Sequence, residues 1–307
     1  MDVKGSVDYC QGMDTLRYED RINRAIALID RQIDKDLSLE RLADEACMSS
    51  FHFHRVFSSL TGESIHSFTT RMRMQRALAL TQRGTKPQWK DVAGALGYRS
   101  PDVFSRAFKR QYGCTPSEFD LQGWWRERPD REATLQVSSY FLRPAPPVSS
   151  DFVVTMQSRP ASKLILSRAT GAYVEPGRLL AAYDAISKAA AQLQVALPGR
   201  LSGASQDDPE LVPLSRCRYD FALEVADDTA IPKHLLAGYR EEGRWAVTHV
   251  SGDMEAVDRS WNMLFKSWLP QSSVELRDAP AEEIYHATPE AIGWDSFHLT
   301  LALPIKD

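Results

Sequence analysis

The chain has 307 residues, of which 43% are hydrophobic and 25% are charged, a composition typical of a globular protein with room for two domains. No apolar run approaches the ~18–20 residues of a membrane span, and the polar N-terminus has no signal core, so neither a membrane span nor export is expected. The four cysteines lie far apart with no CxxC pair, which favours reduced cytosolic thiols over a disulfide framework or a zinc site. The net charge of −4 is unevenly divided, because residues 1–128 hold 20 Lys and Arg against 17 Asp and Glu, and the remainder holds 17 against 24.

The first ~120 residues predict a series of helices. Residues 18–33 carry an apolar stripe at helical spacing, and a short helix is expected after the capping residue Ser38. Ser49 or Ser50 is expected to cap the next helix, over residues 51–60. A long helix is then expected over residues 64–83, where Gly84, Thr85 and Pro87 end it.

This pattern is an internal repeat. Phe53 and Phe57 recur 51 residues later as Phe104 and Phe108, and Gly62 and Phe68 recur as Gly113 and Phe119. Earlier pairs, such as Ser50 with Ser100, match at a shift of 50. A one-residue insertion in the turn explains the difference, so the same helical unit is expected to occur twice.

Each unit has the order of a helix-turn-helix, in which the second helix enters the major groove and the first crosses the backbone. Phe53 and Phe57 can face the core with Leu42. Arg55 and Arg106, each flanked by two phenylalanines, can make bidentate hydrogen bonds to guanine, worth ~1–3 kcal/mol of discrimination. The side chains left for DNA contact are Phe51, His52, His54 and Arg55 in the first unit and Asp102, Val103, Ser105, Arg106 and Arg110 in the second.

The length of the connecting helix predicts joint binding by the two units. Twenty residues at ~1.5 Å each give ~30 Å, close to the ~34 Å between successive major grooves on one face of DNA. One chain is therefore expected to bind double-stranded DNA as a monomer. The alternative is a purely structural helical repeat whose arginines are solvated.

Residues 19–124 resemble the DNA-binding domain of the AraC/XylS family. The resemblance is closest in the second unit, over residues 97–101, 104–110 and 115–119 together with Gly113. It implies an all-α double helix-turn-helix domain, promoter binding, transcriptional control and contact with RNA polymerase.

The family's pattern also implies roles for individual residues. His54 and Arg55 fall on base-reading positions of the first recognition helix, and Arg106 does so in the second. Lys109 and Arg110 are expected to contact phosphates, which makes binding dependent on salt. At Asp102 the family's pattern has a side chain that donates a hydrogen bond to a base or a phosphate, which a carboxylate does not do. The first recognition helix, with His54 and Arg55, is therefore expected to read its DNA half-site more specifically than the second.

The back half of the chain predicts a second domain that mixes strands and helices. We expect a disordered segment over residues 1–17, the helix-turn-helix domain over 18–124, a linker over 125–150 with a strand near 135–142, and the second domain over 151–307. Its expected strands cover residues 152–156, 164–166, 219–225, 245–250 and 297–303, and its expected helices cover 178–193 and 254–268. Thr170-Gly171 and Ser251-Gly252, each before a helix, indicate a weaker second repeat.

Residues 150–307 resemble the GyrI-like effector-binding domain. The matching segments are Gly171–Tyr173, Asp207–Pro209, Arg218–Asp220, Trp245–Val247 with Gly252, Trp261–Pro270 and Pro280–Tyr285. The resemblance implies an α+β domain of two βαββ-type halves around a ligand cleft. It also implies that Glu283 is the pocket carboxylate, with Tyr285, Tyr219 and Trp261 as walls, and we add Tyr173. The alternative for Glu283 is a solvated acid at a strand edge, like its neighbour Glu282.

The order of the two domains is that of Rob-type regulators, which implies a one-component regulator of drug or stress response. An aromatic pocket with a buried carboxylate favours a small lipophilic cation. We therefore expect a cytoplasmic transcription factor without a metal, a cofactor, membrane contact or catalytic activity. Two alternatives remain: a back domain that hydrolyses small molecules with Glu283 as general base, and one that binds only protein partners.

Overall fold

The structure is a computed structural model that describes residues 18–81, 88–127, 152–209, 212–277 and 279–306. It divides between Trp124 and Trp125 into two compact units, and each unit is described by itself. The expected N-terminal segment over residues 1–17, the expected strand near 135–142 and most of the expected linker lie outside the described residues. No helix within the described ranges is long and apolar enough to cross a membrane.

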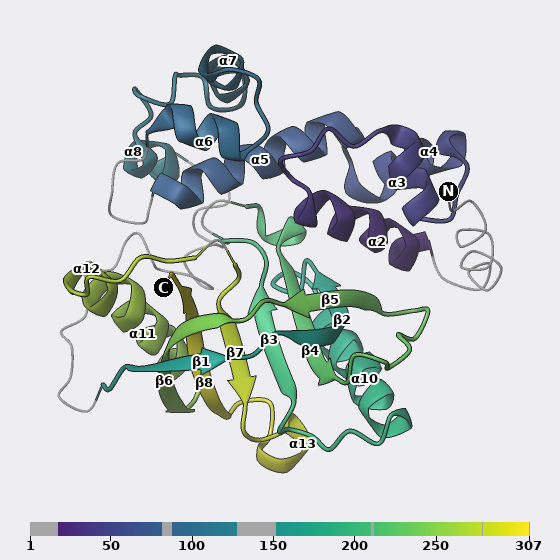
Figure 1. The fold of residues 1–307 in the computed structure, drawn as a ribbon, viewed down its shortest axis with the longest axis vertical. Coiled ribbons are helices and arrows are strands. Elements are labelled where there is room, and N and C mark those ends of the chain that lie inside the picture. Colours follow the sequence, from purple (N-terminus) through teal and green to yellow (C-terminus); the bar gives the residue numbers. More distant parts are fainter. Residues whose placement is uncertain (1–17, 82–87, 128–151, 210–211, 278, 307) are drawn as a thin grey trace. The chain divides into compact units, whose positions relative to one another are not determined.

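The first unit is helical throughout its described residues (Figure 1). Its helices are α2 (Tyr18–Arg31), α3 (Leu39–Glu45), α4 (Ser50–Thr61), α5 (Ile65–Thr81), α6 (Trp89–Ala95), α7 (Pro101–Tyr112) and α8 (Leu121–Arg126). Ile22, Ile26 and Ile29 of α2 are buried against Leu42 of α3 and Phe53 of α4, as the apolar stripe predicts.

The helix ends confirm the internal repeat. Ser49 caps α4 by accepting from the backbone N–H of His52, and Ser100 caps α7 by accepting from that of Val103. Both helices have 12 residues. Both end at a glycine in the left-handed region, where a residue without Cβ is favoured.

The connecting helix α5 has 17 residues as described, which corresponds to ~25 Å at ~1.5 Å per residue. The expected helix over residues 64–83 is therefore shortened at its start, because Ser64 precedes the helix and accepts a hydrogen bond from the backbone N–H of Ser67. Residues 82 and 83 lie outside the described residues. The length of α5 is thus below the ~34 Å of one DNA turn.

The second unit is built on one eight-stranded antiparallel sheet with the order β1-β6-β8-β7-β3-β4-β2-β5 (Figure 1). The strands are β1 (Thr155–Arg159), β2 (Ser162–Thr170), β3 (Leu201–Ser205), β4 (Arg218–Val225), β5 (Leu236–Arg240), β6 (Gly243–Gly252), β7 (Glu282–Tyr285) and β8 (Phe297–Ile305). The helices are α10 (Gly177–Gln192), η1 (Leu214–Arg216), α11 (Met254–Asn262), the π-helical segment η2 (Met263–Trp268), α12 (Leu269–Gln271) and α13 (Pro289–Ile292).

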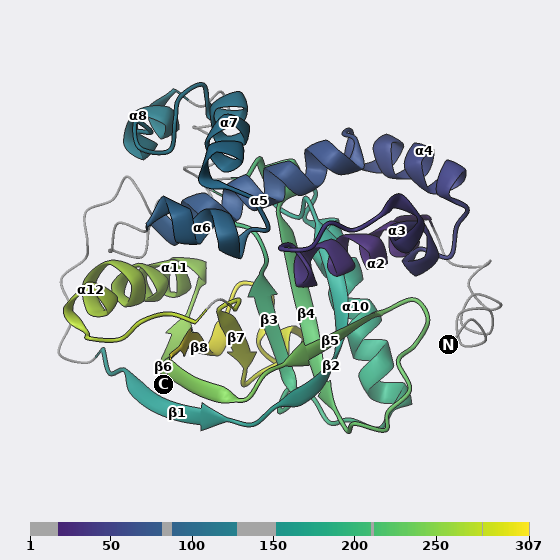
Figure 2. The ribbon, with the colours of Figure 1, turned by 45° about the horizontal axis from the view of Figure 1, so that its top comes forward.

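The strand order contains two βαββ halves, β2-α10-β3-β4 and β6-α11-β7-β8, that join through β3 and β7. Strand β1 precedes the first half but pairs with β6 of the second half. Strand β5 precedes the second half but pairs with β2 of the first half. Figure 2 shows β1 running on into β2 and β5 into β6. The expected all-α first domain and α+β second domain with two βαββ halves are therefore confirmed, although the sequence did not predict β3, β5 and β7.

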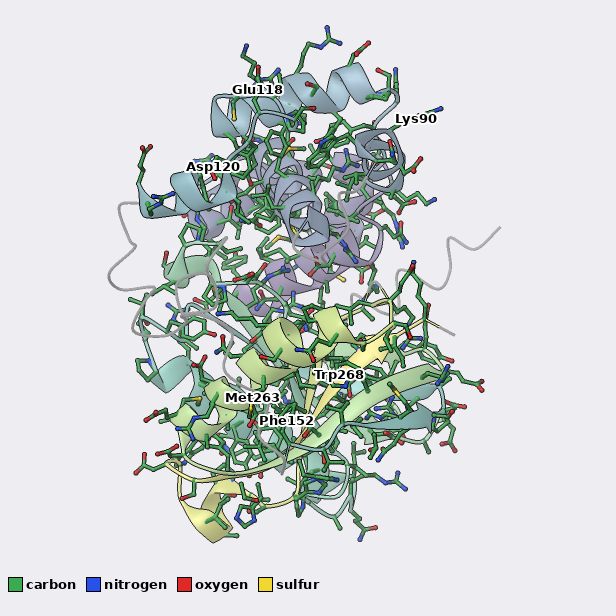
Figure 3. All side chains as sticks on the ribbon, turned by 90° about the vertical axis from the view of Figure 1, so that its left-hand side faces the viewer. Lys90, Glu118, Asp120, Phe152, Met263 and Trp268 are labelled. Carbon is green, nitrogen blue, oxygen red and sulfur yellow. The ribbon has the colours of Figure 1, made fainter. Side chains whose placement is uncertain are left out.

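One face of the sheet carries the main apolar core. Successive side chains along a strand point to opposite faces, and the register assigns Leu299, Leu301 and Leu303 of β8 to this face. Helix α10 covers it beside β2 and β4, and α11 covers it beside β6. Phe152 and Trp268 also pack against this core (Figure 3).

Candidate effector site and DNA-reading surface

Glu283 lies on the interior strand β7, between β3 and β8. It is paired with Gly203 of β3 and with Leu301 of β8. Since Leu301 faces the core, the Glu283 side chain lies on the same face, beneath the helices. Glu283 is therefore half-buried on an interior strand and not at an edge of the sheet.

Two neutral groups hold the Glu283 carboxylate. The Tyr219 hydroxyl donates to Oε2 at 2.7 Å, and the Trp261 indole N–H donates to Oε1 at 3.0 Å. The Tyr285 hydroxyl lies 2.9 Å from that of Tyr219. The structure thus joins Glu283, Tyr219, Tyr285 and Trp261, from strands β7 and β4 and helix α11, into one hydrogen-bonded group.

Burial determines the protonation of this group. Desolvation raises the pKa of Glu283, and the hydrogen bonds from Trp261 and Tyr219 oppose that rise. Desolvation, with the Glu283 charge as the second cause, also raises the pKa of both Tyr219 and Tyr285. Both phenols therefore stay neutral at physiological pH, and they can donate a hydrogen bond but not a positive charge.

Glu283 differs from the acids on the opposite face of the sheet, which pair with arginines. Asp220 accepts two hydrogen bonds from Arg168 at 2.7 Å, and Glu282 accepts one from Arg159 at 2.7 Å. In the described part of the chain, no Lys or Arg forms such a pair with Glu283. Glu283 is half-buried, and a carboxylate withdrawn from water is less favourable without a cation than with one.

Aromatic rings extend from the hydrogen-bonded group on the side of Tyr219 and on the side of Trp261. The centroid of the Phe221 ring lies 5.1 Å from that of Tyr219 and 5.5 Å from that of Tyr183. The Tyr183 ring centroid lies 5.2 Å from that of Trp294. On the other side, Trp261 stacks on Phe265 at 5.7 Å. Such rings can bind a lipophilic cation by dispersion and by cation–π attraction.

Tyr173 lies in the turn between β2 and α10, outside the hydrogen-bonded group. Its side chain is 41% exposed, yet desolvation raises its pKa, with further contributions from the charges of Cys217 and Glu283. It is therefore near the site without a direct contact to Glu283 in the described hydrogen bonds. Its role as a wall of the site stays a prediction.

Gly203 is a residue of this site that the sequence reasoning missed. A Cβ built on Gly203 would lie 2.5 Å from Cζ of Tyr219 and closer still to its hydroxyl oxygen. The glycine therefore leaves the space through which the Tyr219 phenol crosses β3 to reach Glu283. A glycine inside a short strand is a known signal of such close approach, and this signal was present in Leu201–Ser205.

Replacing Gly203 by Ala is expected to displace the Tyr219 phenol and to break its hydrogen bond to Glu283. Because a hydrogen bond to a charged group contributes about 1.5–3 kcal/mol, the affinity for a cationic probe should fall about tenfold or more. Isothermal titration calorimetry with tetraphenylphosphonium measures this. Gly199→Ala is the matched control, since a Cβ there meets no atom within 4 Å. Equal affinities of the two variants would contradict the prediction.

The first candidate DNA-reading surface is the exposed face of α4. Phe51, His52, His54 and Arg55 are all exposed, whereas Phe53 and Phe57 are buried, as expected. Phe51 is 68% exposed, and the Arg55 guanidinium lies over its ring at 5.6 Å. An apolar ring beside a guanidinium suits a thymine methyl next to a guanine edge.

The second surface is the exposed face of α7, on the side away from the buried Phe104 and Phe108. Asp102, Arg106, Lys109 and Arg110 are exposed, and Ser105 is half-buried. Asp102 lies in the first turn of α7, after Pro101 at the first helical position. A carboxylate there stabilises the helix by interacting with its dipole, which gives Asp102 a structural explanation.

Two family profiles match the chain. Residues 42–122 match a family described as a helix-turn-helix domain, and residues 153–306, half of the chain, match a family described as a GyrI-like small molecule binding domain. The two matches fall on the helical unit and on the unit with the eight-stranded sheet.

Two relatives and one solved structure are similar to parts of this chain. Regulatory protein SoxS of Escherichia coli is 34% identical over 98 residues, which are 32% of this chain and 91% of SoxS. Transcriptional regulator Rob of Salmonella typhimurium is 30% identical over 97 residues, which are 32% of this chain and 33% of Rob. The crystal structure of a hydrolase from Listeria innocua matches 56% of this chain and 98% of its own, at 12% identity and a TM-score of 0.37.

The two family matches agree with the repeated helical unit and with the order of the two domains. The chain belongs to the GyrI-like family through its C-terminal domain, and it is a DNA-binding transcriptional regulator of the AraC/XylS type in which this domain follows the helix-turn-helix domain.

Proposed function

We propose that this regulator responds to a small lipophilic cation that binds at Glu283. The observation that carries the proposal is a half-buried carboxylate that, within the described ranges, is held by the neutral donors Tyr219 and Trp261. A ligand cation would supply the positive charge that Arg168 and Arg159 supply to the acids on the other face. Its apolar part would lie against the rings of Tyr219, Phe221 and Trp261.

We further propose that one chain reads two half-sites, with α4 in one major groove and α7 in the next. The matched capping and equal length of these helices support this reading. Bound effector would then alter either the affinity for the promoter or the contact with RNA polymerase. The similarity to SoxS and Rob supports a role in transcription.

The test compares two ions of the same shape and opposite charge. Calorimetry with the full chain should show saturable binding of tetraphenylphosphonium and no binding of tetraphenylborate. Equal binding of both ions would indicate an unspecific apolar surface and would contradict the proposal. Footprinting on a duplex recovered by the protein from a randomised library, with and without the phosphonium, then tests whether the cation affects DNA binding.

A second candidate function is hydrolysis of a reactive small molecule in the same site. The observation in its favour is the raised pKa of Glu283, since a general base works best with a pKa near the operating pH. Incubation of the protein with a bound compound, followed by mass spectrometry, separates the two functions. A sensor returns the compound unaltered, whereas a hydrolase returns products whose masses add up to that of the compound plus one water.

A further inference from the structure

The joint between the two helix-turn-helix units contains a contact that neither recognition helix makes. Helix α5 connects the units, and its length limits the distance between them. A helix alone does not stop the bundles at its ends from turning about the connecting residues. A fixed spacing of α4 and α7 therefore requires a second contact between the units.

Arg73, in the middle of α5, provides the first half of this contact. Its Nε donates to the carbonyl oxygen of Ile33 at 2.8 Å, and its Nη2 donates to that of Lys35 at 2.7 Å. Both carbonyls belong to the turn between α2 and α3 of the first unit. Hydrogen bonds from a charged donor are stronger than those between neutral groups, so these two bonds hold the turn against α5.

The second unit meets the same guanidinium. The Tyr98 ring, in the turn between α6 and α7, lies under Arg73 at 5.5 Å. The Tyr98 hydroxyl is buried without a hydrogen-bond partner among the described residues. Its ring packs edge-on against Phe104 of α7, with centroids 5.4 Å apart. Tyr98 therefore acts through its ring, which links Arg73 directly to the second recognition helix.

The backbones of the two units also approach closely at this point. Gly97 has φ +75°, and a Cβ there would lie 2.7 Å from the carbonyl carbon of Asp34 and closer still to its oxygen. Asp34 lies between Ile33 and Lys35, the two residues that Arg73 holds. The equivalent position of the first unit is Cys47, which also has a positive φ, of 50°. Gly97 thus permits a contact that a residue with a side chain would prevent.

We propose that Arg73, Tyr98 and Gly97 form a clamp that fixes the two recognition helices relative to each other and so determines which spacing of DNA half-sites one chain accepts. The inference rests on the proposed reading of two half-sites by one chain. A rigid joint raises the effective concentration of the second helix at its groove once the first is bound. Arg73 is a positioning residue, because it acts through the two units rather than on DNA.

The experiment measures the affinity of the full chain for three kinds of DNA. The first is a duplex with both half-sites, recovered by the wild-type protein from a randomised library. The second carries one or two extra base pairs between the half-sites, each of which turns one half-site by about a tenth of a helical turn. The third keeps only the half-site that α4 reads.

Arg73→Met is expected to lower the affinity for the duplex with both half-sites about tenfold and to reduce the penalty for inserted base pairs. The affinity for the single half-site should change by less than about twofold, because the α4 unit keeps its own core. Arg71→Met is the matched control. The Arg71 guanidinium lies two positions away on α5, pairs with Glu63 at 2.7 Å and covers Phe68 at 4.8 Å, all within the first unit.

Two results would overturn the clamp. One is an Arg73→Met protein that keeps the wild-type penalty for inserted base pairs. If that variant does not fold, Gly97→Ala tests the same joint from the second unit, and unchanged binding to both half-sites would also overturn it. A wild-type protein indifferent to inserted base pairs would instead show that one chain does not read two half-sites, which is a failure of the proposed function.

Discussion

Glu283→Gln is expected to lower the affinity for tetraphenylphosphonium by about 30-fold or more at pH 7.5. Removing one partner of a buried charge pair costs about 2–5 kcal/mol, and each ~1.4 kcal/mol is a factor of ten in affinity. Glutamine keeps the shape of the side chain and one acceptor oxygen for either the Tyr219 or the Trp261 hydrogen bond, and it removes the charge. Calorimetry at constant ionic strength measures the loss.

The same substitution is expected to stabilise the domain without ligand at neutral pH. Burial raises the pKa of Glu283 in the folded state, so the folded chain binds the proton more tightly than the unfolded chain. The free energy of unfolding therefore falls as the pH rises from the unfolded pKa through the folded one. Glutamine has no such pH-dependent loss of the free energy of unfolding. We expect this free energy to rise by about 0.5–2 kcal/mol, the usual size of a single stabilising substitution.

Two further measurements define this prediction. In the wild type, cation affinity should weaken as the pH falls through the raised pKa of Glu283, because the proton neutralises the carboxylate. Asp184→Asn is the control, since it removes the same charge from an exposed pair with Lys188 on α10. A Glu283→Gln protein that binds the cation like the wild type would refute the assignment of Glu283 as the pocket carboxylate.

Arg106→Ala is expected to reduce the affinity for the selected duplex by about 1–3 kcal/mol, as is usual for the loss of one bidentate contact with a base. Arg106 is exposed on α7, so the fold should be unaffected. Arg55→Ala should have a similar or larger effect, because it also removes the cation that covers Phe51. Fluorescence anisotropy at matched salt measures both losses, and the melting temperature confirms folding.

Lys109→Ala is the comparison that distinguishes base reading from charge. A phosphate contact should weaken binding to all sequences alike and reduce the slope of log K against log salt by about 1. Arg106→Ala should instead relax selectivity at one base pair. If Arg106→Ala changes affinity for specific and scrambled duplexes equally, Arg106 is a phosphate contact and not a base reader.

Much of the helical domain could be predicted from the sequence, because its signals are local. Ser49 and Ser100 cap the helices that follow them, and the paired phenylalanines face the core four residues apart. The joint could not be predicted. Arg73 reaches carbonyls 40 and 38 residues away, and a hydrogen bond to a backbone carbonyl leaves no mark in the identity of Ile33 or Lys35.

In the second domain, the long strands β2, β4, β6 and β8 and both long helices were predicted from their apolar patterns, whereas β3, β5 and β7 were not. Those three strands have only four or five residues each, too few for a pattern of alternation to stand out. They include the two strands that join the halves. The resemblance to the GyrI-like family placed the halves, but the strand exchange at β1 and β5 came only from the structure.

The sequence by itself determined that two recognition helices precede a domain rich in aromatic residues and acids. Only the tertiary structure decided what those acids do, as the adjacent residues Glu282 and Glu283 demonstrate. Because neighbouring side chains on a strand point to opposite faces, Glu282 meets Arg159 and Glu283 meets Tyr219 and Trp261. Two identical residues thus differ in their surroundings, since the pairing of β7 between β3 and β8 brings an arginine to Glu282 and, in the part of the chain that the structure describes, two neutral donors to Glu283.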